Sequence, residues 1–183
     1  MKKAWRDARR CAKKVYGSLG REALVIGLLS VLVFGVLTRF VGQSFQVDGR
    51  CMEPRLYTGE RVLGEKMTFR RRPPRRGDVI VFIHPQQPSE LYIKRIVALG
   101  GQTVAIRSGR VYVDERPLAE PYVVHASNEN WGPHRVIDGR YFVLGDNRPD
   151  SDDSRVWGDV DGRNVVARAC LRYWPPDRWA APF

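Results

Sequence analysis

The chain begins with a basic stretch, continues with a long apolar run and then changes to short alternating segments. Residues 23–37 (ALVIGLLSVLVFGVL) hold no charge, and the apolar character continues to about residue 45, interrupted by Arg39. A helix of this length spans about 30 Å of hydrocarbon, and Arg39 lies close enough to its end for the side chain to reach the interface. The pattern predicts one N-terminal transmembrane helix over residues 23–45.

Two other interpretations of this run are a cleaved signal peptide and a buried core helix. The uncharged core of 15 residues would suit a signal peptide, but no A-x-A-like cleavage site follows residue 37. A core helix is disfavoured by the basic flank and by the lack of a polar face. An uncleaved anchor is therefore the favoured interpretation.

After residue 45 the pattern becomes that of β-strands separated by turns rich in Gly, Pro and Asp. We expect a mostly β, antiparallel domain over 46–174, with a small polar insertion at about 114–138 and a C-terminal tail over 175–183. An exposed loop is expected over 70–76 around two prolines. The expected strands are Arg61–Leu63, Val79–Ile83, Tyr92–Leu99, Thr103–Ile106, Arg110–Val113, Tyr141–Leu144 and Val165–Tyr173.

The distribution of charge predicts the orientation of the chain in the membrane. The chain has 183 residues, 31 basic and 20 acidic, for a net charge of +11. Residues 1–22 hold eight basic and two acidic groups, a net +6, so the positive-inside rule places 1–22 in the cytoplasm and the remainder outside. The composition excludes a disordered, collagen-like or polytopic membrane protein. Membrane lipid is the expected partner of this charge, and nucleic acid is not.

No metal or cofactor is expected. The three histidines are scattered, no HExxH, CxxC or G-x-S-x-G motif occurs, and the acidic segment 146–153 lacks the Gly and terminal Glu of an EF-hand. Cys11 lies on the cytoplasmic side in this topology, so a disulfide could join only Cys51 and Cys170.

Three segments combine polar chemistry with a strand context. A turn-like segment over 49–54 follows the anchor and contains Cys51. Lys94 lies in a run apolar enough to bury a lysine, and the polar segment 145–155 directly follows an apolar strand. Such segments are typical of a structured site.

Four motifs in this order, 47–56, 76–82, 92–97 and 145–158, resemble those of bacterial type I signal peptidase, the membrane-anchored serine–lysine protease that removes signal peptides. The resemblance implies the fold of that family's antiparallel β catalytic domain. Cys51 stands where the family has its nucleophilic serine, and Arg55 replaces a threonine. Further departures follow the lysine motif, at Ala98, Gly100 and Gln102.

The resemblance also implies roles. Lys94 would be the general base, which requires burial because a free lysine has a pKa of about 10.4. Ser151 would orient the lysine amine, and the backbone N–H of Cys51 would hold the oxyanion. Some members add a serine hydroxyl at the position of Gly49. The supporting ion pairs would involve Asp146, Arg95, Asp153 and Arg155.

Three explanations remain for Cys51: a natural Cys–Lys peptidase, an engineered replacement of serine, or a weak or inactive homologue. The implied substrates are preproteins cut after small residues at −1 and −3, with the secretion machinery as a possible partner. The implied location is the cell membrane, single-pass, with the catalytic domain outside. Rival functions are a specialised processing peptidase of a secretion or conjugation system, a self-cleaving transcriptional regulator and a nucleic-acid-binding membrane protein.

Overall fold

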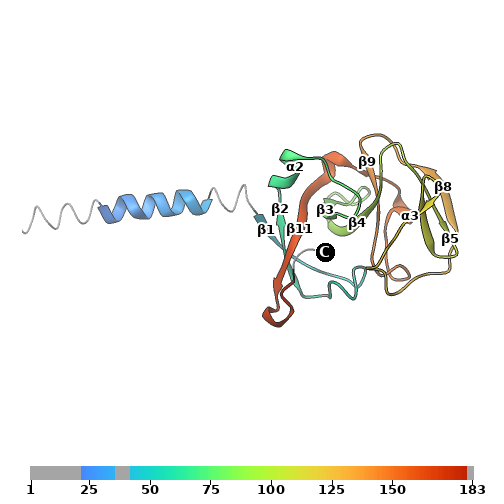
Figure 1. Ribbon diagram of the computed structural model, residues 1–183. Coiled ribbons are helices and arrows are strands. Elements are labelled where there is room, and N and C mark those ends of the chain that lie inside the picture. Colours follow the sequence, from blue (N-terminus) through green and yellow to red (C-terminus); the bar gives the residue numbers. More distant parts are fainter. Residues whose placement is uncertain (1–21, 36–41, 181–183) are drawn as a thin grey trace, which may run out of the picture. The chain divides into compact units, whose positions relative to one another are not determined.

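The computed structural model describes residues 22–35 and 42–180, in two units divided after residue 41 (Figure 1). Residues 22–35 form a helix. Within the described ranges, no helix has both the length and the apolar character needed to cross a membrane. Residues 1–21 and 36–41, which include parts of the expected basic segment and anchor, lie outside the described residues.

The expected end of the anchor at residue 45 is wrong. Residues 42–45 belong to strand β1 (Gly42–Gln46), which pairs antiparallel with β2 (Arg61–Glu65) along all of its length. The pairing satisfies the backbone groups of these residues across the sheet. The sequence pattern did not show this boundary, because an apolar residue such as Phe45 fits a transmembrane helix and a half-buried strand equally well.

The second unit is built from two antiparallel sheets, one with the order β1-β2-β11-β3-β4-β9-β10 and the other with the order β7-β6-β5-β8. Short helices lie between strands. The remaining elements are α2 (Met67–Arg71), β3 (Val79–Ile83), β4 (Leu91–Leu99), β5 (Thr103–Arg107), β6 (Arg110–Val113), β7 (Arg116–Pro117), β8 (Trp131–Arg135), β9 (Arg140–Leu144), α3 (Ser154–Trp157), β10 (Val160–Asp161), η1 (Gly162–Asn164), β11 (Val165–Trp174) and η2 (Pro176–Arg178).

The mostly β, antiparallel class is confirmed, and all seven expected strands are present with ends that move by at most two residues. The segment expected as an insertion, 114–138, contains β7 and β8. β8 pairs with β5, and Trp131 packs against the core beneath the second sheet. The sequence pattern did not predict β8, because the Gly-Pro pair within it interrupts the alternation of apolar and polar residues. The expected loop over 70–76 is shortened by α2, which ends at Arg71.

The core lies in three clusters that follow the sheets. One joins β4 and β9 to the second sheet through Val97, Val104 and Phe142. Another surrounds Phe82, on β3. The third packs beneath the loop that joins β1 to β2, where Met52 and Leu56 are fully buried. This last cluster fixes the loop that carries Cys51.

The start of β3 is fastened by one carboxylate. Arg72 donates two hydrogen bonds to Asp78, at 2.8 and 3.0 Å, and the backbone N–H of Arg75 donates a third at 2.9 Å. Arg168 of β11 donates from Nε at 3.2 Å. Burial by itself raises the pKa of Asp78, but these hydrogen bonds and positive charges lower it overall from its ordinary value of 3.8.

This depressed pKa predicts how stability depends on pH. Ionised Asp78 stabilises the fold fully above the unfolded pKa, and the contribution is lost as pH falls through the folded pKa. We expect Asp78→Asn to lower the free energy of unfolding by about 1–3 kcal/mol at pH 7. We also expect the variant to lose less stability than the wild type below about pH 5.

Urea unfolding measured from pH 7 to pH 3 tests this prediction. Asp177→Asn, an exposed position on η2, is the matched control and should follow the wild-type pH profile. Parallel profiles for Asp78→Asn and the wild type would contradict the role of this carboxylate.

Candidate active site

A cleft of about 770 Å³ opens beside the large sheet. One wall is formed by β1 and the loop after it, residues 44–51. Glu90 and the first half of β4, residues 91–94, also line the cleft, together with Asp150 and Asp152. Cys51 and Lys94 both line this cleft, so the structure brings together the two residues expected to react.

The loop that carries Cys51 is held by Asn147 through two neighbouring carbonyls. The carbonyl of Cys51 accepts a hydrogen bond from the backbone N–H of Asn147 at 2.9 Å, and the side-chain amide of Asn147 donates to the carbonyl of Arg50 at 3.1 Å. The thiol is half-buried and lies 3.8 Å from the carbonyl oxygen of Ile93. Cys51 and Cys170 are both free thiols, so the one disulfide that the sequence allowed is not formed.

Gly49 lies on the same wall in a left-handed conformation, with φ of 91°. No heavy atom lies within 4 Å of the place where a Cβ would stand. The position therefore has room for a side chain but an unfavourable backbone for one. A second oxyanion donor from this residue is limited to its main chain.

Lys94 is buried, with 3% of its surface exposed. Its Nζ lies 5.0 Å from the centre of the Tyr92 ring, and within residues 42–180 it forms no hydrogen bond or ion pair. Burial chiefly, and then the charges of Glu90 and Asp152, raise the pKa of Tyr92. The lysine is thus buried, as the sequence predicts, and its amine lies beside an aromatic ring.

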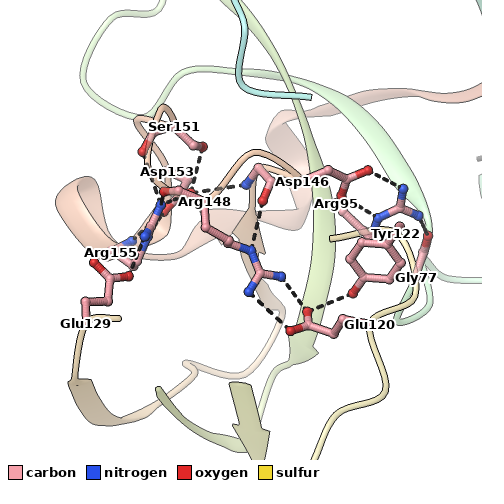
Figure 2. Close-up of polar contacts among 11 residues, drawn as sticks. Gly77, Arg95, Glu120, Tyr122, Glu129, Asp146, Arg148, Ser151, Asp153 and Arg155 are labelled. Atoms are coloured by element: carbon pink, nitrogen blue, oxygen red, sulfur yellow. Dashed lines mark hydrogen bonds and ion pairs between the residues drawn. The ribbon is translucent and has the colours of Figure 1, made fainter. Parts of the chain in front are cut away.

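Ser151 lies in the loop after β9, where its hydroxyl donates to Asp153 at 2.7 Å. Asp153 is fully buried and forms a bidentate ion pair with Arg155, both contacts at 2.8 Å (Figure 2). Burial by itself lowers the pKa of Arg155, but the carboxylates of Asp153 and Glu129 raise it overall. The expected contact of Ser151 is with the lysine amine, whereas its hydrogen bond in the structure is to Asp153.

Arg95 and Asp146 form a second buried ion pair, with contacts of 2.8 and 2.6 Å. Arg95 also donates to the carbonyl of Gly77 at 3.0 Å, which ties the site to the turn before β3. Since Arg95 follows Lys94 and Asp146 precedes Asn147, this pair joins the strand of the lysine to the segment that holds Cys51.

Gly145 occupies the narrow space between these groups. A Cβ at this position would stand 2.3 Å from Oγ of Ser151 and 2.6 Å from the carbonyl oxygen of Cys51. The backbone N–H of Gly145 donates to Asp153 at 3.1 Å. Only a residue without a side chain lets the Cys51 and Ser151 segments approach this closely.

A cluster that sequence reasoning missed fastens the other side of the Cys51 loop. Arg172 and Arg178 donate to the carbonyls of Arg55 and Pro54, respectively. Both arginines pair with the buried carboxylate of Glu60, at 3.6 and 2.7 Å. The two arginines lie more than 100 residues from their partners, so no local pattern could reveal the cluster.

Three further residues that were missed come from the polar segment 118–129. Glu120 pairs with Arg148, Glu129 pairs with Arg155, and the ring of Tyr122 lies 4.0 Å from the guanidinium carbon of Arg95 (Figure 2). The sequence offers one local sign of these residues, the Glu-Pro-Tyr segment at 120–122. A turn around a proline does not require a tyrosine, so the tyrosine points to a further contact.

Comparison with known proteins shows the family of the chain. The family described as signal peptidase, peptidase S26, matches residues 20–174. Signal peptidase I of Leptolyngbya laminosa is 42% identical over 84% of this chain and 78% of its own length. Probable signal peptidase I-1 of Synechocystis sp. is 39% identical over 83% and 82%, and signal peptidase I of Mycobacterium tuberculosis is 31% identical over 97% and 79%.

A crystal structure of a signal peptidase I from Enterococcus faecalis V583 is 34% identical, with a TM-score of 0.47 over 53% of this chain and 97% of that chain. These sequence matches show the enzyme class of the chain, which is an endopeptidase, a hydrolase of the signal peptidase I type. The chain belongs to the signal peptidase family, peptidase S26.

The packing around Gly145 generates a prediction. We expect Gly145→Ala to lower peptidase activity by about 100-fold, because a methyl group would displace Ser151 and the Cys51 carbonyl. Gly27→Ala is the control, because that helical position has no heavy atom within 4 Å. Steady-state cleavage of a precursor peptide measures the effect. Equal activity of Gly145→Ala and Gly27→Ala would show that the close approach is unimportant.

Proposed function

We propose that this protein is a membrane-anchored signal peptidase I that removes signal peptides from exported preproteins with a Cys51–Lys94 dyad. The observation that supports the proposal is that a half-buried thiol and a buried lysine line one cleft, in a chain of the signal peptidase family. Because the buried Lys94 side chain and the Cys51 thiol line the same cleft, the lysine amine is placed to act as the general base for the thiol.

In the first half of the proposed reaction, the amine of Lys94 acts as the general base and takes the thiol proton of Cys51. The sulfur attacks the scissile carbonyl carbon, and the carbonyl π electrons move to oxygen. The backbone N–H of Cys51 stabilises that oxyanion. When the carbonyl re-forms, the C–N bond breaks, and Lys94 returns its proton to the leaving amine. The product is a thioester on Cys51 and a released mature chain.

In the second half, Lys94 takes a proton from water as the water attacks the thioester carbon. Collapse of this second intermediate breaks the C–S bond, frees the carboxyl end of the signal peptide and restores the thiol with the proton held by Lys94. A thiolate is a good nucleophile and a good leaving group, so cysteine can serve both steps.

The free edge of β4 offers a place for an extended substrate. β4 pairs with β3 through residues 91–95, but it pairs with β9 only from Arg95 onward. The main-chain groups of residues 91–94 on that side can therefore bind a peptide as an added strand. Phe45 and Ile93 pack with Cys51 against one core cluster, and such bulky walls favour small residues at −1 and −3 of the cleavage site.

We infer a single-pass anchor from the N-terminal unit, with the N-terminus in the cytoplasm and the catalytic domain outside. The helix over residues 22–35 leaves apolar side chains exposed around its circumference, including Leu28 at 63%, Val31 at 72% and Phe34 at 69%. A helix without a polar face suits a lipid environment. The net +6 of residues 1–22 sets the orientation.

The nucleophile is tested by substitution at Cys51. We expect Cys51→Ala to lower turnover of a secretory precursor by about 10⁴-fold or more, because no covalent intermediate can form. Cys51→Ser should retain measurable activity. Cleavage is followed by gel electrophoresis, and Cys170→Ala is the control thiol. A Cys51→Ala variant as active as the wild type would refute the assignment.

The general base is tested by Lys94→Met, which keeps the length and burial of the side chain but removes the amine. We expect a folded domain whose turnover falls by about 10²–10⁴-fold with little change in KM. Circular dichroism establishes folding, and Lys66→Met, which follows β2 and donates to Gln43 outside the cleft lining, is the matched control. Wild-type turnover by Lys94→Met would exclude this role.

A further inference from the structure

The polar segment 118–129 lies against the loop that follows β9. We call this segment the strap. The carbonyl of His125 accepts a hydrogen bond from the backbone N–H of Arg148 at 3.2 Å, and Leu118 packs against the core cluster below the second sheet. The strap is therefore fastened to the domain at its start and to the site loop near its middle.

Glu120 of the strap forms an ion pair with the site loop. Its two carboxylate oxygens accept from Arg148 at 2.5 and 3.1 Å, and Oε1 also accepts from the hydroxyl of Tyr122 at 2.9 Å (Figure 2). The side chain of Arg148 is 1% exposed. A guanidinium so deeply buried requires this carboxylate, because an unpaired charge in the interior is strongly unfavourable.

Arg148 transmits this contact to the catalytic loop. Its Nε donates to the carbonyl of Gly145 at 3.0 Å. Gly145 is the residue whose Cα lies against both Ser151 and the carbonyl of Cys51. A continuous set of contacts thus runs from Glu120 through Arg148 to the segment that separates these two functional residues.

Tyr122 contacts the second half of the site. Its ring lies 4.0 Å from the guanidinium carbon of Arg95, the residue next to Lys94. Burial chiefly, and then the charge and hydrogen bond of Glu120, raise the pKa of Tyr122, so the hydroxyl stays protonated and keeps donating to Glu120. Two strap residues thereby contact Arg95, which follows Lys94 in β4, and Arg148, which is hydrogen-bonded to Gly145.

We propose that Glu120 is a positioning residue for catalysis, which acts through Arg148 and Gly145 to set the placement of Cys51 relative to Lys94, with Tyr122 holding Glu120 in place. The inference rests on the proposed function. A positioning role differs from a purely structural one in its consequence: when Glu120 is replaced, the chemical step is slowed while the domain stays folded and still binds substrate.

The experiment compares Glu120→Ala, Glu120→Gln and Tyr122→Phe with Glu115→Gln in the full-length protein. Glu115 is the matched control, because it forms an exposed ion pair with Arg107 away from the cleft. Turnover and KM are measured with one precursor peptide at a temperature where each variant is folded by circular dichroism. The rate of iodoacetamide alkylation of Cys51 is measured in parallel, with Cys11 and Cys170 replaced by serine.

We expect Glu120→Ala to lower kcat by about 10–100-fold with KM within about twofold of the wild type, because a small misplacement of reacting groups has effects of this size. Alkylation of Cys51 should slow in the same variant, because the thiol loses its neighbouring base. Glu120→Gln keeps one oxygen that can accept a hydrogen bond from Arg148 and should lie between Glu120→Ala and the wild type. Tyr122→Phe should have a smaller effect, and Glu115→Gln none.

Unchanged kcat and alkylation in a folded Glu120→Ala, with only a lower melting temperature, would overturn the proposal and leave Glu120 a structural residue. If Glu120→Ala does not fold, unchanged kcat and alkylation in Glu120→Gln would overturn it equally. An increase in KM alone would also contradict it. Failure of the proposed function is distinct, because the wild type itself would then cleave no precursor.

Discussion

The site depends above all on the buried ion pair between Arg95 and Asp146. Neither group is exposed to solvent beyond a few per cent, and removing one partner of such a pair costs about 3–5 kcal/mol because the other charge is left buried. Arg95 extends β4 beyond Lys94, and Asp146 begins the segment that binds the Cys51 carbonyl. The pair therefore holds β4 and the loop after β9 at the spacing that the proposed chemistry needs.

Other arginine–carboxylate pairs surround this contact and give it a rigid frame. Arg148 with Glu120 and Arg155 with Asp153 lie in the same loop region, and both arginines are almost fully buried. Planar guanidinium groups bind carboxylates through two parallel hydrogen bonds, which fixes orientation as well as distance. Part of the positive charge of this chain consequently serves the interior of the domain.

The large sheet also creates the cleft by an interruption in its pairing. β4 changes partners along its length: it pairs with β3 alone over residues 91–94, with both β3 and β9 at Arg95, and with β9 beyond it. The unpaired edge lies beside Cys51, and the buried half of the strand carries Lys94. One strand thus offers a peptide-binding edge and a base within a few residues of each other.

The amino-acid sequence determined the strands, the antiparallel class and the ordered motifs, because alternation and turn residues act over a few neighbours. It also indicated which residues could react, including Cys51 and Lys94. It did not reveal the end of the apolar run at β1, the strand β8, or the partners Glu60, Glu120 and Glu129. Those features depend on contacts between segments tens of residues apart, such as the 28 residues between Glu120 and Arg148, and burial after folding decides which charges must pair.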